Sequence, residues 1–225
     1  MNLFCTKKPL LVLLFIAVLW VPTQTNAQEI AIARIKYSGG GDWYNDPSSL
    51  NNLLSFAASS FPTTLSLNYR DVDLGDSDLY LYPFAFLTGH GGLSYNKSEL
   101  DNLRDYLDYG GFLYIDDDYG LDESVRKMAK DLFPDEALVV LPFDHAIYKA
   151  PFNFSAGLPK IHEHNGLPPK GLGIFRNGRL VLFYSYESNL ADGWADPEVH
   201  KDPQSIRELA LKMGTNILLY AINGE

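Results

Sequence analysis

The chain has 225 residues, of which 46% are hydrophobic and 20% are charged, a composition typical of a globular protein rather than a disordered or fibrous one. Its 28 acidic and 18 basic residues give a formal net charge of −10. This charge argues against nucleic acid as a partner, because phosphate contacts need a basic face.

Residues 1–27 have the pattern of a secretory signal peptide. Lys7 and Lys8 precede an apolar stretch at 10–21, and the polar segment PTQTNA then ends in a small residue. The apolar stretch is short for a membrane span, and an uncleaved N-terminal anchor is the alternative interpretation. Cleavage would leave 198 residues with 16 basic and 28 acidic side chains and would remove Cys5, the one cysteine of the chain. We therefore expect an exported protein with no transmembrane segment after leader removal, no thiol nucleophile and no thiolate metal ligand.

Residues 28–225 predict a single α/β domain, because short apolar runs alternate with stretches of helical periodicity. In the first half, Asn96 and Glu99 have the spacing of an N-terminal capping box, and Gly110 ends the helix that follows. The elements predicted in this half are a strand at 30–37, a helix near 48–60, strands at 65–69 and 84–89, and a helix at 96–110.

The second half contains two further helices and a hairpin. Asp122 is the expected N-cap of one helix, and Asp202 and Pro203 fit the N-cap and first residue of a closing helix. Asn177-Gly178 lies between two apolar runs, which is the pattern of a tight β-hairpin. The strands predicted here are 112–115, 137–142 and the hairpin at 171–186. Together the elements predict a three-layer α/β sandwich with a mainly parallel central sheet and a C-terminal antiparallel hairpin.

Three loops that follow predicted strands are rich in polar residues, and parallel α/β sheets bind ligands where such loops gather. One loop has three consecutive aspartates, and each like-charge pair about 6 Å apart costs roughly 3 kcal/mol at an effective dielectric of 20. A helix N-terminus compensates only one such charge. In an extended chain Asp116 and Asp118 point to one side and Asp117 to the other, so at most two meet one ligand. The ligand-binding candidates of these loops are Asp42 and Trp43 in GGGDWYNDP, His90 in TGHGG, and Asp116, Asp117 and Asp118 in DDDYG.

Two later segments add candidates. His162 and His164 in PKIHEHNG lie on one face of an extended chain, a spacing that suits a divalent cation but also occurs in hydrogen-bonded loops. The acidic segment 185–203 is either a solvated loop or part of a site. In it, Glu187 directly follows a predicted strand, and Trp194 is expected to pack or to stack on a ligand.

These residues complete the candidate list. Glu187 and Trp194 join the ligand-binding candidates, and the segment that contains them also holds Asp192, Asp196, Glu198 and His200. No catalytic residue is assigned, because the sequence has no G-x-S-x-G nucleophile motif, and the glycines at 39–41 lack the dinucleotide-binding spacing. A divalent metal is the cofactor that the pattern favours, with the ligand set Asp116, Asp117, His162, His164 and Glu187.

A family resemblance extends from about residue 30 to the C-terminus. It is carried by the segments ARIKYSGGGDWYNDP, LTGHGGLSYNKSELDNLRDYLDYGGFLYIDDDYG, LPKIHEHNG, GLGIFRNGRLVLFYSYES and DGWADPEVHKDP. These segments resemble the bacterial family catalogued as domain of unknown function 4159. The resemblance implies a flavodoxin-like fold of the class I glutamine amidotransferase-like group and a bacterial protein, which the predicted leader would send to the periplasm or out of the cell. It brings no established activity.

The same resemblance implies a degenerate active site. In class I amidotransferases a cysteine follows a central strand, and a His-Pro-Glu triplet follows a later hairpin strand. Here Asp116 or Asp117 stands where the cysteine would be, and Ser185, Tyr186 and Glu187 stand at the triplet. Without a thiol and its base, the acyl-enzyme route is closed. The resemblance still implies a pocket where the aspartates and Glu187 meet.

Two functions remain after these exclusions. The first is an exported binding or scaffolding protein that holds a polar small molecule, a sugar, a peptide or a cation without chemistry. The second is a metal-dependent hydrolase with Asp, His and Glu ligands and a spare carboxylate as general base. A structural role in an envelope protein complex is a third interpretation, supported by the predicted leader alone.

Overall fold

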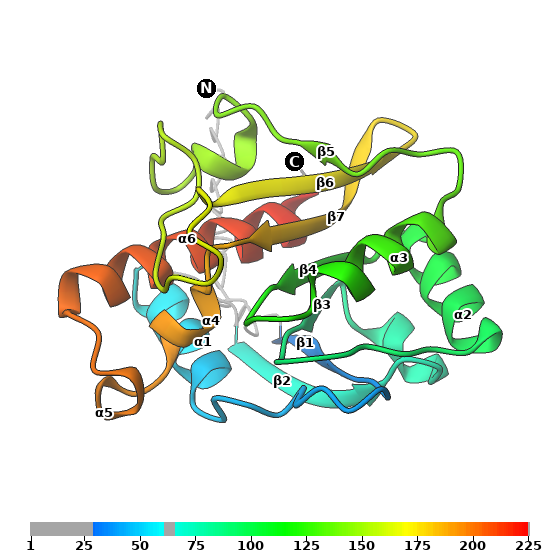
Figure 1. The fold of residues 1–225 in the computed structure, drawn as a ribbon, viewed down its shortest axis with the longest axis horizontal. Coiled ribbons are helices and arrows are strands. Elements are labelled where there is room, and N and C mark those ends of the chain that lie inside the picture. Colours follow the sequence, from blue (N-terminus) through cyan, green and yellow to red (C-terminus); the bar gives the residue numbers. More distant parts are fainter. Residues whose placement is uncertain (1–28, 61–65, 225) are drawn as a thin grey trace, which may run out of the picture.

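The computed structural model describes residues 29–60 and 66–224, so the predicted signal peptide lies outside the described residues. Seven strands form one sheet in the order β2-β1-β3-β4-β7-β6-β5 (Figure 1). Their bounds are β1 (Glu29–Lys36), β2 (Ser66–Asp73), β3 (Phe84–Leu87), β4 (Phe112–Asp116), β5 (Val139–Val140), β6 (Lys170–Arg176) and β7 (Arg179–Tyr186). Neighbours from β2 to β7 are parallel, whereas β6 and β5 are added antiparallel. This confirms an α/β fold with a mainly parallel sheet and the expected C-terminal hairpin.

Helices flank both faces of the sheet. They are α1 (Ser49–Ser60), α2 (Lys97–Asp108), α3 (Asp122–Leu132), α4 (Leu190–Trp194), α5 (Pro197–His200) and α6 (Gln204–Asn223), with 3-10 turns at Ser77–Leu81 and Ala146–Tyr148. Helices α2 and α3 pack on one face, and α1, α4 and α6 pack on the other (Figure 1). Within the described parts of the chain, no helix combines the length and apolar character that a membrane span requires.

Strand β4 lies in the middle of the sheet and separates two halves of the core. Leu113 and Ile115 pack in the cluster that contains α2 and α3, whereas Phe112 and Tyr114 pack with α1 and α6. Because side chains alternate along a strand, Asp116 continues on the face of α1 and α6. All five residues of β4 are buried. The aspartates that follow β4 therefore begin inside the protein and not at its surface.

Two local patterns of the sequence are confirmed. The Asn96 side chain accepts a hydrogen bond from the Glu99 backbone N–H at 3.0 Å, and the Glu99 carboxylate accepts one from the Asn96 N–H at 2.7 Å. The β6–β7 hairpin turns at Asn177 and Gly178, whose φ angles are 52° and 81°, the left-handed conformation that a two-residue hairpin turn requires.

Three predicted boundaries are wrong. Leu121 is the N-cap of α3 and Asp122 is its first residue; the Asp122 carboxylate instead accepts a hydrogen bond from Tyr184 at 3.0 Å. Pro203, not Asp202, is the N-cap of α6. The Asp202 carboxylate instead accepts a hydrogen bond from His162, which lies in the loop at 159–165. The strand predicted at 137–142 contains only the two residues of β5, which pair with β6 at the edge of the sheet.

The substitution Asn96→Ala should lower the free energy of unfolding by about 1 kcal/mol, because it removes the side-chain acceptor that caps α2. Urea unfolding followed by circular dichroism measures this loss. Asn96→Asp keeps an acceptor at the same place and is the matched control. Equal losses in both variants would contradict the capping role.

Candidate functional site

The carboxyl ends of the parallel strands meet at one edge of the sheet, beside α4 and α5 (Figure 1). The loop after β1 brings Asn45 and Asp46 to this edge, and the loop after β4 brings Asp118. Helix α4 contributes Asp192, and α5 contributes His200. These five side chains come from four separate parts of the sequence, so the fold alone brings them together.

Helix α4 is held close to α6 and α1. A Cβ at Gly193 would lie 2.4 Å from the Ala210 Cβ of α6, so only glycine permits this approach. Trp194 is fully buried and donates a hydrogen bond from Nε1 to the Ala210 carbonyl at 2.9 Å. Asn52 of α1 donates to the Trp194 carbonyl at 2.9 Å. These contacts fix Asp192, and they place Trp194 in the core rather than against a ligand.

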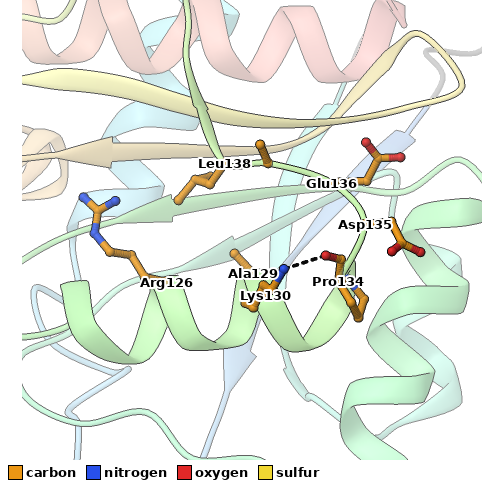
Figure 2. Close-up of a pocket in the computed structure, with 8 residues that line it drawn as sticks. Arg126, Ala129, Lys130, Pro134, Asp135, Glu136 and Leu138 are labelled. Carbon is orange, nitrogen blue, oxygen red and sulfur yellow. Dashed lines mark hydrogen bonds between the residues drawn. The ribbon is translucent and has the colours of Figure 1, made fainter.

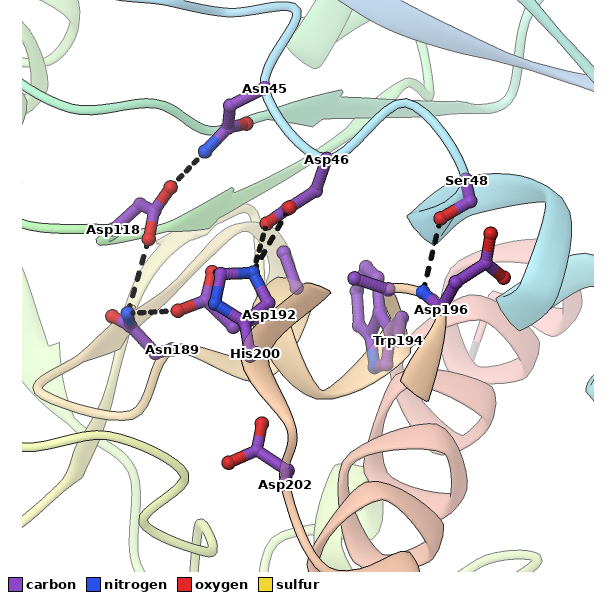
Figure 3. A network of polar contacts seen from close by, with 12 residues as sticks. Asn45, Asp46, Ser48, Asp118, Asn189, Asp192, Trp194, Asp196, His200 and Asp202 are labelled. Carbon is purple, nitrogen blue, oxygen red and sulfur yellow. Dashed lines mark hydrogen bonds and ion pairs between the residues drawn. The ribbon is translucent and has the colours of Figure 1, made fainter. Parts of the chain in front are cut away.

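Three carboxylates form the centre of the site. Oxygens of Asp46, Asp118 and Asp192 all lie within 4.8 Å of one another (Figure 3). At that separation each pair of ionised carboxylates repels by about 3.5 kcal/mol at an effective dielectric of 20. Three such pairs approach the whole free energy of unfolding of an ordinary domain, about 5–15 kcal/mol. Positive charge or bound protons must therefore compensate them.

Among the described residues, the basic side chains paired with these carboxylates are histidines, not lysines or arginines. His162 Nδ1 lies 2.5 Å from Asp192 Oδ2, and His200 Nε2 lies 3.0 Å from both oxygens of Asp46. The other nitrogen of His162, Nε2, lies 3.0 Å from Asp202 Oδ1. A histidine with one nitrogen in a carboxylate cluster and the other on an outer carboxylate is the arrangement of histidine ligands in metal sites.

The electrostatics of the cluster reflect this crowding. Burial, followed by repulsion from Asp192, raises the pKa of Asp118 to about 10. Burial also raises the pKa of Asp46. Burial alone would raise the pKa of Asp192 as well, but hydrogen bonds from His162 and Asp118 lower it to about 2. The hydrogen bond to Asp192 is the main cause that raises the pKa of His162 to about 9. These shifts have the directions expected where buried carboxylates crowd together beside imidazoles.

Several buried oxygens around the cluster have no hydrogen-bond partner within the described residues. They are Oδ1 of Asp192, of Asn189 and of Asn45. Asp192 is 4% exposed and Asn189 is 3% exposed. The amide nitrogen of Asn189 donates to Asp118 at 3.1 Å and to Asp192 at 2.8 Å, and that of Asn45 donates to Asp118 (Figure 3). Buried acceptors without donors are costly, and a cation bound among the three carboxylates would satisfy Oδ1 of Asp192.

Asp116 and Asp117, the other two predicted aspartates, each accept hydrogen bonds from groups outside the cluster. Asp116 is fully buried and accepts hydrogen bonds from Ser185 Oγ, from the Tyr114 hydroxyl at 3.0 Å and from the Ala191 N–H at 2.7 Å. Asp117 points to the opposite face and accepts from the backbone N–H groups of Tyr119 and Leu121, each at 3.3 Å. The alternation expected from the sequence is present, and it brings Asp118 rather than Asp117 to the cluster.

Glu187 is not part of the carboxylate cluster and is paired with a lysine instead. Its fully buried carboxylate accepts hydrogen bonds from Lys160 Nζ at 2.8 Å and from the Asn165 side chain at 2.9 Å. Burial alone would raise the pKa of Glu187, but these bonds lower it. Because Lys160 and Asn165 bracket His162 and His164, Glu187 fixes the loop that carries both histidines. Of the five predicted metal ligands, only His162 belongs to a group of three or more donor atoms that lie within 4.8 Å of one another among the described residues.

The remaining candidates lie at different distances from the cluster. His90 Nδ1 lies 3.3 Å from Asp118 Oδ2 and 3.2 Å from Asp42 Oδ2. His90 and Asp42 therefore both border the cluster. Trp43 instead packs against the core, with the Arg34 guanidinium 5.3 Å from its ring.

An open hollow of about 480 Å³ adjoins the cluster. It is lined by His90, Asp118, Tyr119, His162, Glu163, His164, Asn189, Asp192 and His200. Both ring nitrogens of His164 are buried without a hydrogen-bond partner among the described residues, and its ring contacts that of Tyr119 edge to face. Burial lowers the pKa of His164.

A second hollow of about 400 Å³ lies along α3 and residues 134–138 (Figure 2). Its charged side chains are of both signs and none is fully buried; Lys130 donates to the Pro134 carbonyl at 2.6 Å. It brings no group of buried acids and histidines together, so we assign the functional site to the first hollow.

Sequence reasoning missed Asp46, Asn189 and Asp202 as individual site residues, and it gave Asp192 and His200 no separate role. Asp46 lies in the loop that was singled out, four positions after Asp42. The nearest available signal was the concentration of Asp, Trp and His in segment 185–203, which both short helices occupy.

Comparison with known proteins gives a family and no relative of known activity. No curated protein matches the chain. The sequence model of one family, described as domain of unknown function (DUF4159), matches residues 31–222. This match covers the whole sheet, apart from the first residues of β1, and all of the site. The chain therefore belongs to the DUF4159 family.

Proposed function

We propose that this protein binds a divalent cation through Asp46, Asp118, Asp192, His162 and His200, and that the cation holds a polar ligand in the hollow beside it. Carboxylate oxygens and imidazole nitrogens are the usual protein ligands of Zn²⁺ and Mn²⁺. One observation carries the proposal: Asp192 is buried at the centre of three acids, and its Oδ1 has no hydrogen-bond partner among the described residues, with His200 Nε2 lying 3.8 Å away.

The open side of the site indicates the class of ligand. The hollow of about 480 Å³ is lined by polar and ionisable side chains, which suits a hydroxyl-rich or anionic molecule such as a sugar or a peptide carboxylate. The N-terminal pattern supports export to the periplasm or beyond. We therefore propose an exported binding protein, either free or within an envelope complex.

A distant likeness to the class I amidotransferase fold is part of this proposal. Asp116 of β4 and Ser185 of β7 are register partners, and Ser185 Oγ donates to the Asp116 carboxylate. This contact supports the assignment of these residues to the cysteine and histidine positions of that fold. Their chemistry excludes acyl transfer through a thiol, so the functional centre would have moved from Asp116 to Asp118.

A metal-dependent hydrolase is the second candidate, and His164 is the observation that favours it. Its imidazole lines the hollow, and neither ring nitrogen has a partner in the described structure. A base placed beside a bound cation can accept a proton from water. The difference between the two candidates is whether the bound ligand is cleaved.

The metal-free protein, prepared with a chelator, should gain stability when Zn²⁺ or Mn²⁺ is added. Free metal at 100 times its Kd adds about 2.7 kcal/mol, which raises the melting midpoint of a domain of about 200 residues by roughly 5–10 °C. Melting scans and elemental analysis of the purified protein measure both effects. No bound metal and an unchanged midpoint with each ion would overturn the proposal.

The substitution Asp192→Asn should abolish the metal-dependent rise in the melting midpoint, because it removes a central ligand. Asp116→Asn is the matched buried control: it should retain the rise but lose about 1–3 kcal/mol of stability, because an amide cannot accept all of the hydrogen bonds that Asp116 accepts. Asp135→Asn, at an exposed position, should change neither quantity. A folded Asp116→Asn protein that no longer responds to metal would instead favour the ligand set predicted from sequence.

The metal-loaded protein should not cleave p-nitrophenyl phosphate or p-nitrophenyl acetate faster than the Asp192→Asn variant does. Release of p-nitrophenol measures this directly. Metal-dependent cleavage that Asp192→Asn abolishes, and that His164→Gln slows by about 10²- to 10⁴-fold as loss of a general base would, would establish the hydrolase instead.

A further inference from the structure

The donor atoms of the site fall into two groups that share one residue. His162, Asp192 and His200 form the first group, and Asp46, Asp118 and Asp192 form the second. In each group the donor atoms lie within 4.8 Å of one another. A carboxylate has two oxygens and can bind one cation with each, so Asp192 is placed to bridge two ions.

The two groups differ in chemistry. The first, here named the nitrogen group, has two imidazoles and one carboxylate, which is a ligand set that suits Zn²⁺. The second, the oxygen group, has three carboxylates. Asn45 and Asn189 both donate hydrogen bonds from Nδ2 to Asp118 and so hold one of these carboxylates in place. All-oxygen sets suit Mg²⁺, Ca²⁺ and Mn²⁺.

The two groups touch through His200 Nε2, which lies 3.0 Å from both oxygens of Asp46, and further contacts support each group. Asp202 lies 3.0 Å from His162 Nε2 and orients the nitrogen group from outside. Asn189 donates to both Asp118 and Asp192, and therefore holds the carboxylate that the groups share.

We propose that the site is dinuclear, with Asp192 bridging a zinc-type ion in the nitrogen group and a harder ion in the oxygen group. This inference rests on the proposed function, since it divides the same site into two. Two cations at neighbouring positions can bind one oxyanion between them, so the ligand class narrows to molecules that carry a phosphate or carboxylate group.

The test is the number of ions bound per chain. The metal-free full chain is dialysed against Zn²⁺, against Mn²⁺ and against both, and the bound metal is measured by elemental analysis. Two equivalents are expected with both ions present, one of each. One equivalent under every condition would overturn the dinuclear inference but leave the proposed function in place. Zero equivalents would overturn both.

Variants then assign each ion to its group. Asp118→Asn should lose Mn²⁺ and keep Zn²⁺, and Asp46→Asn repeats the test if the first variant does not fold. His162→Gln, with His200→Gln as its alternative, should lose Zn²⁺ and keep Mn²⁺. Circular dichroism confirms the fold of each variant. Loss of both ions from folded variants of either group would show one shared site and contradict the inference.

Asp202→Asn gives a further readout because it touches no proposed ligand atom of the oxygen group. Loss of an outer carboxylate typically weakens metal binding by about 10- to 100-fold, so the Kd for Zn²⁺ should rise by this factor while that for Mn²⁺ is unchanged. Equal weakening of both ions would contradict two separate groups.

Discussion

Repulsion among three buried carboxylates is the constraint on which this account depends. Asp46, Asp118 and Asp192 come from the loop after β1, the loop after β4 and α4, and the fold brings them together. In the described structure their positive partners are imidazoles and not lysines or arginines. Nearby Glu187 shows the contrasting solution, because its buried charge is paired with Lys160. An acid cluster that is paired with imidazoles alone, and that also contains a buried oxygen without a hydrogen-bond partner, is organised for a cation.

The topology explains why the site is where it is. Parallel strands place all of their carboxyl ends at one edge, and the connecting loops there are free to carry polar residues. The antiparallel addition of β6 to β7 leaves the carboxyl end of β7 at this edge too, so that α4 and α5 can follow directly from it. Close packing of α4 against α6 at Gly193 and Trp194 then fixes Asp192 under the loops. Helix α4 thus contributes both to the core, through Trp194, and to the site, through Asp192.

Local patterns were readable from the sequence, and long-range contacts were not. The capping box at Asn96 and the turn at Asn177-Gly178 depend on neighbours within a few residues, so their residues specify them. The alternation of Asp116, Asp117 and Asp118 also follows from a single strand. This alternation could not reveal which aspartate has its own hydrogen-bond donors in the fold, because Ser185 and Ala191, the donors to Asp116, are 69 and 75 positions away in the sequence.

The missed ligands have the same cause. His200 meets Asp46 across 154 positions, and both lie in segments without helical or strand periodicity. Helices α4 and α5 have only five and four residues, which is too short for a periodic signal. Asp202 matched a helix N-cap by spacing alone, but the histidine that binds it comes from a loop 40 positions earlier. The types of residue in the sequence were enough to predict that the site lies at the carboxyl ends of the strands. Which residues are the proposed metal ligands could be identified only from the fold.

The most direct test is a crystal structure of the protein grown with Mn²⁺ or Zn²⁺, with anomalous diffraction data collected at the absorption edge of the metal. The account predicts anomalous density beside Asp192, between Asp118 on one side and His162 and His200 on the other. Anomalous density elsewhere, or Asp46, Asp118 and Asp192 turned apart into solvent with no density between them, would contradict it.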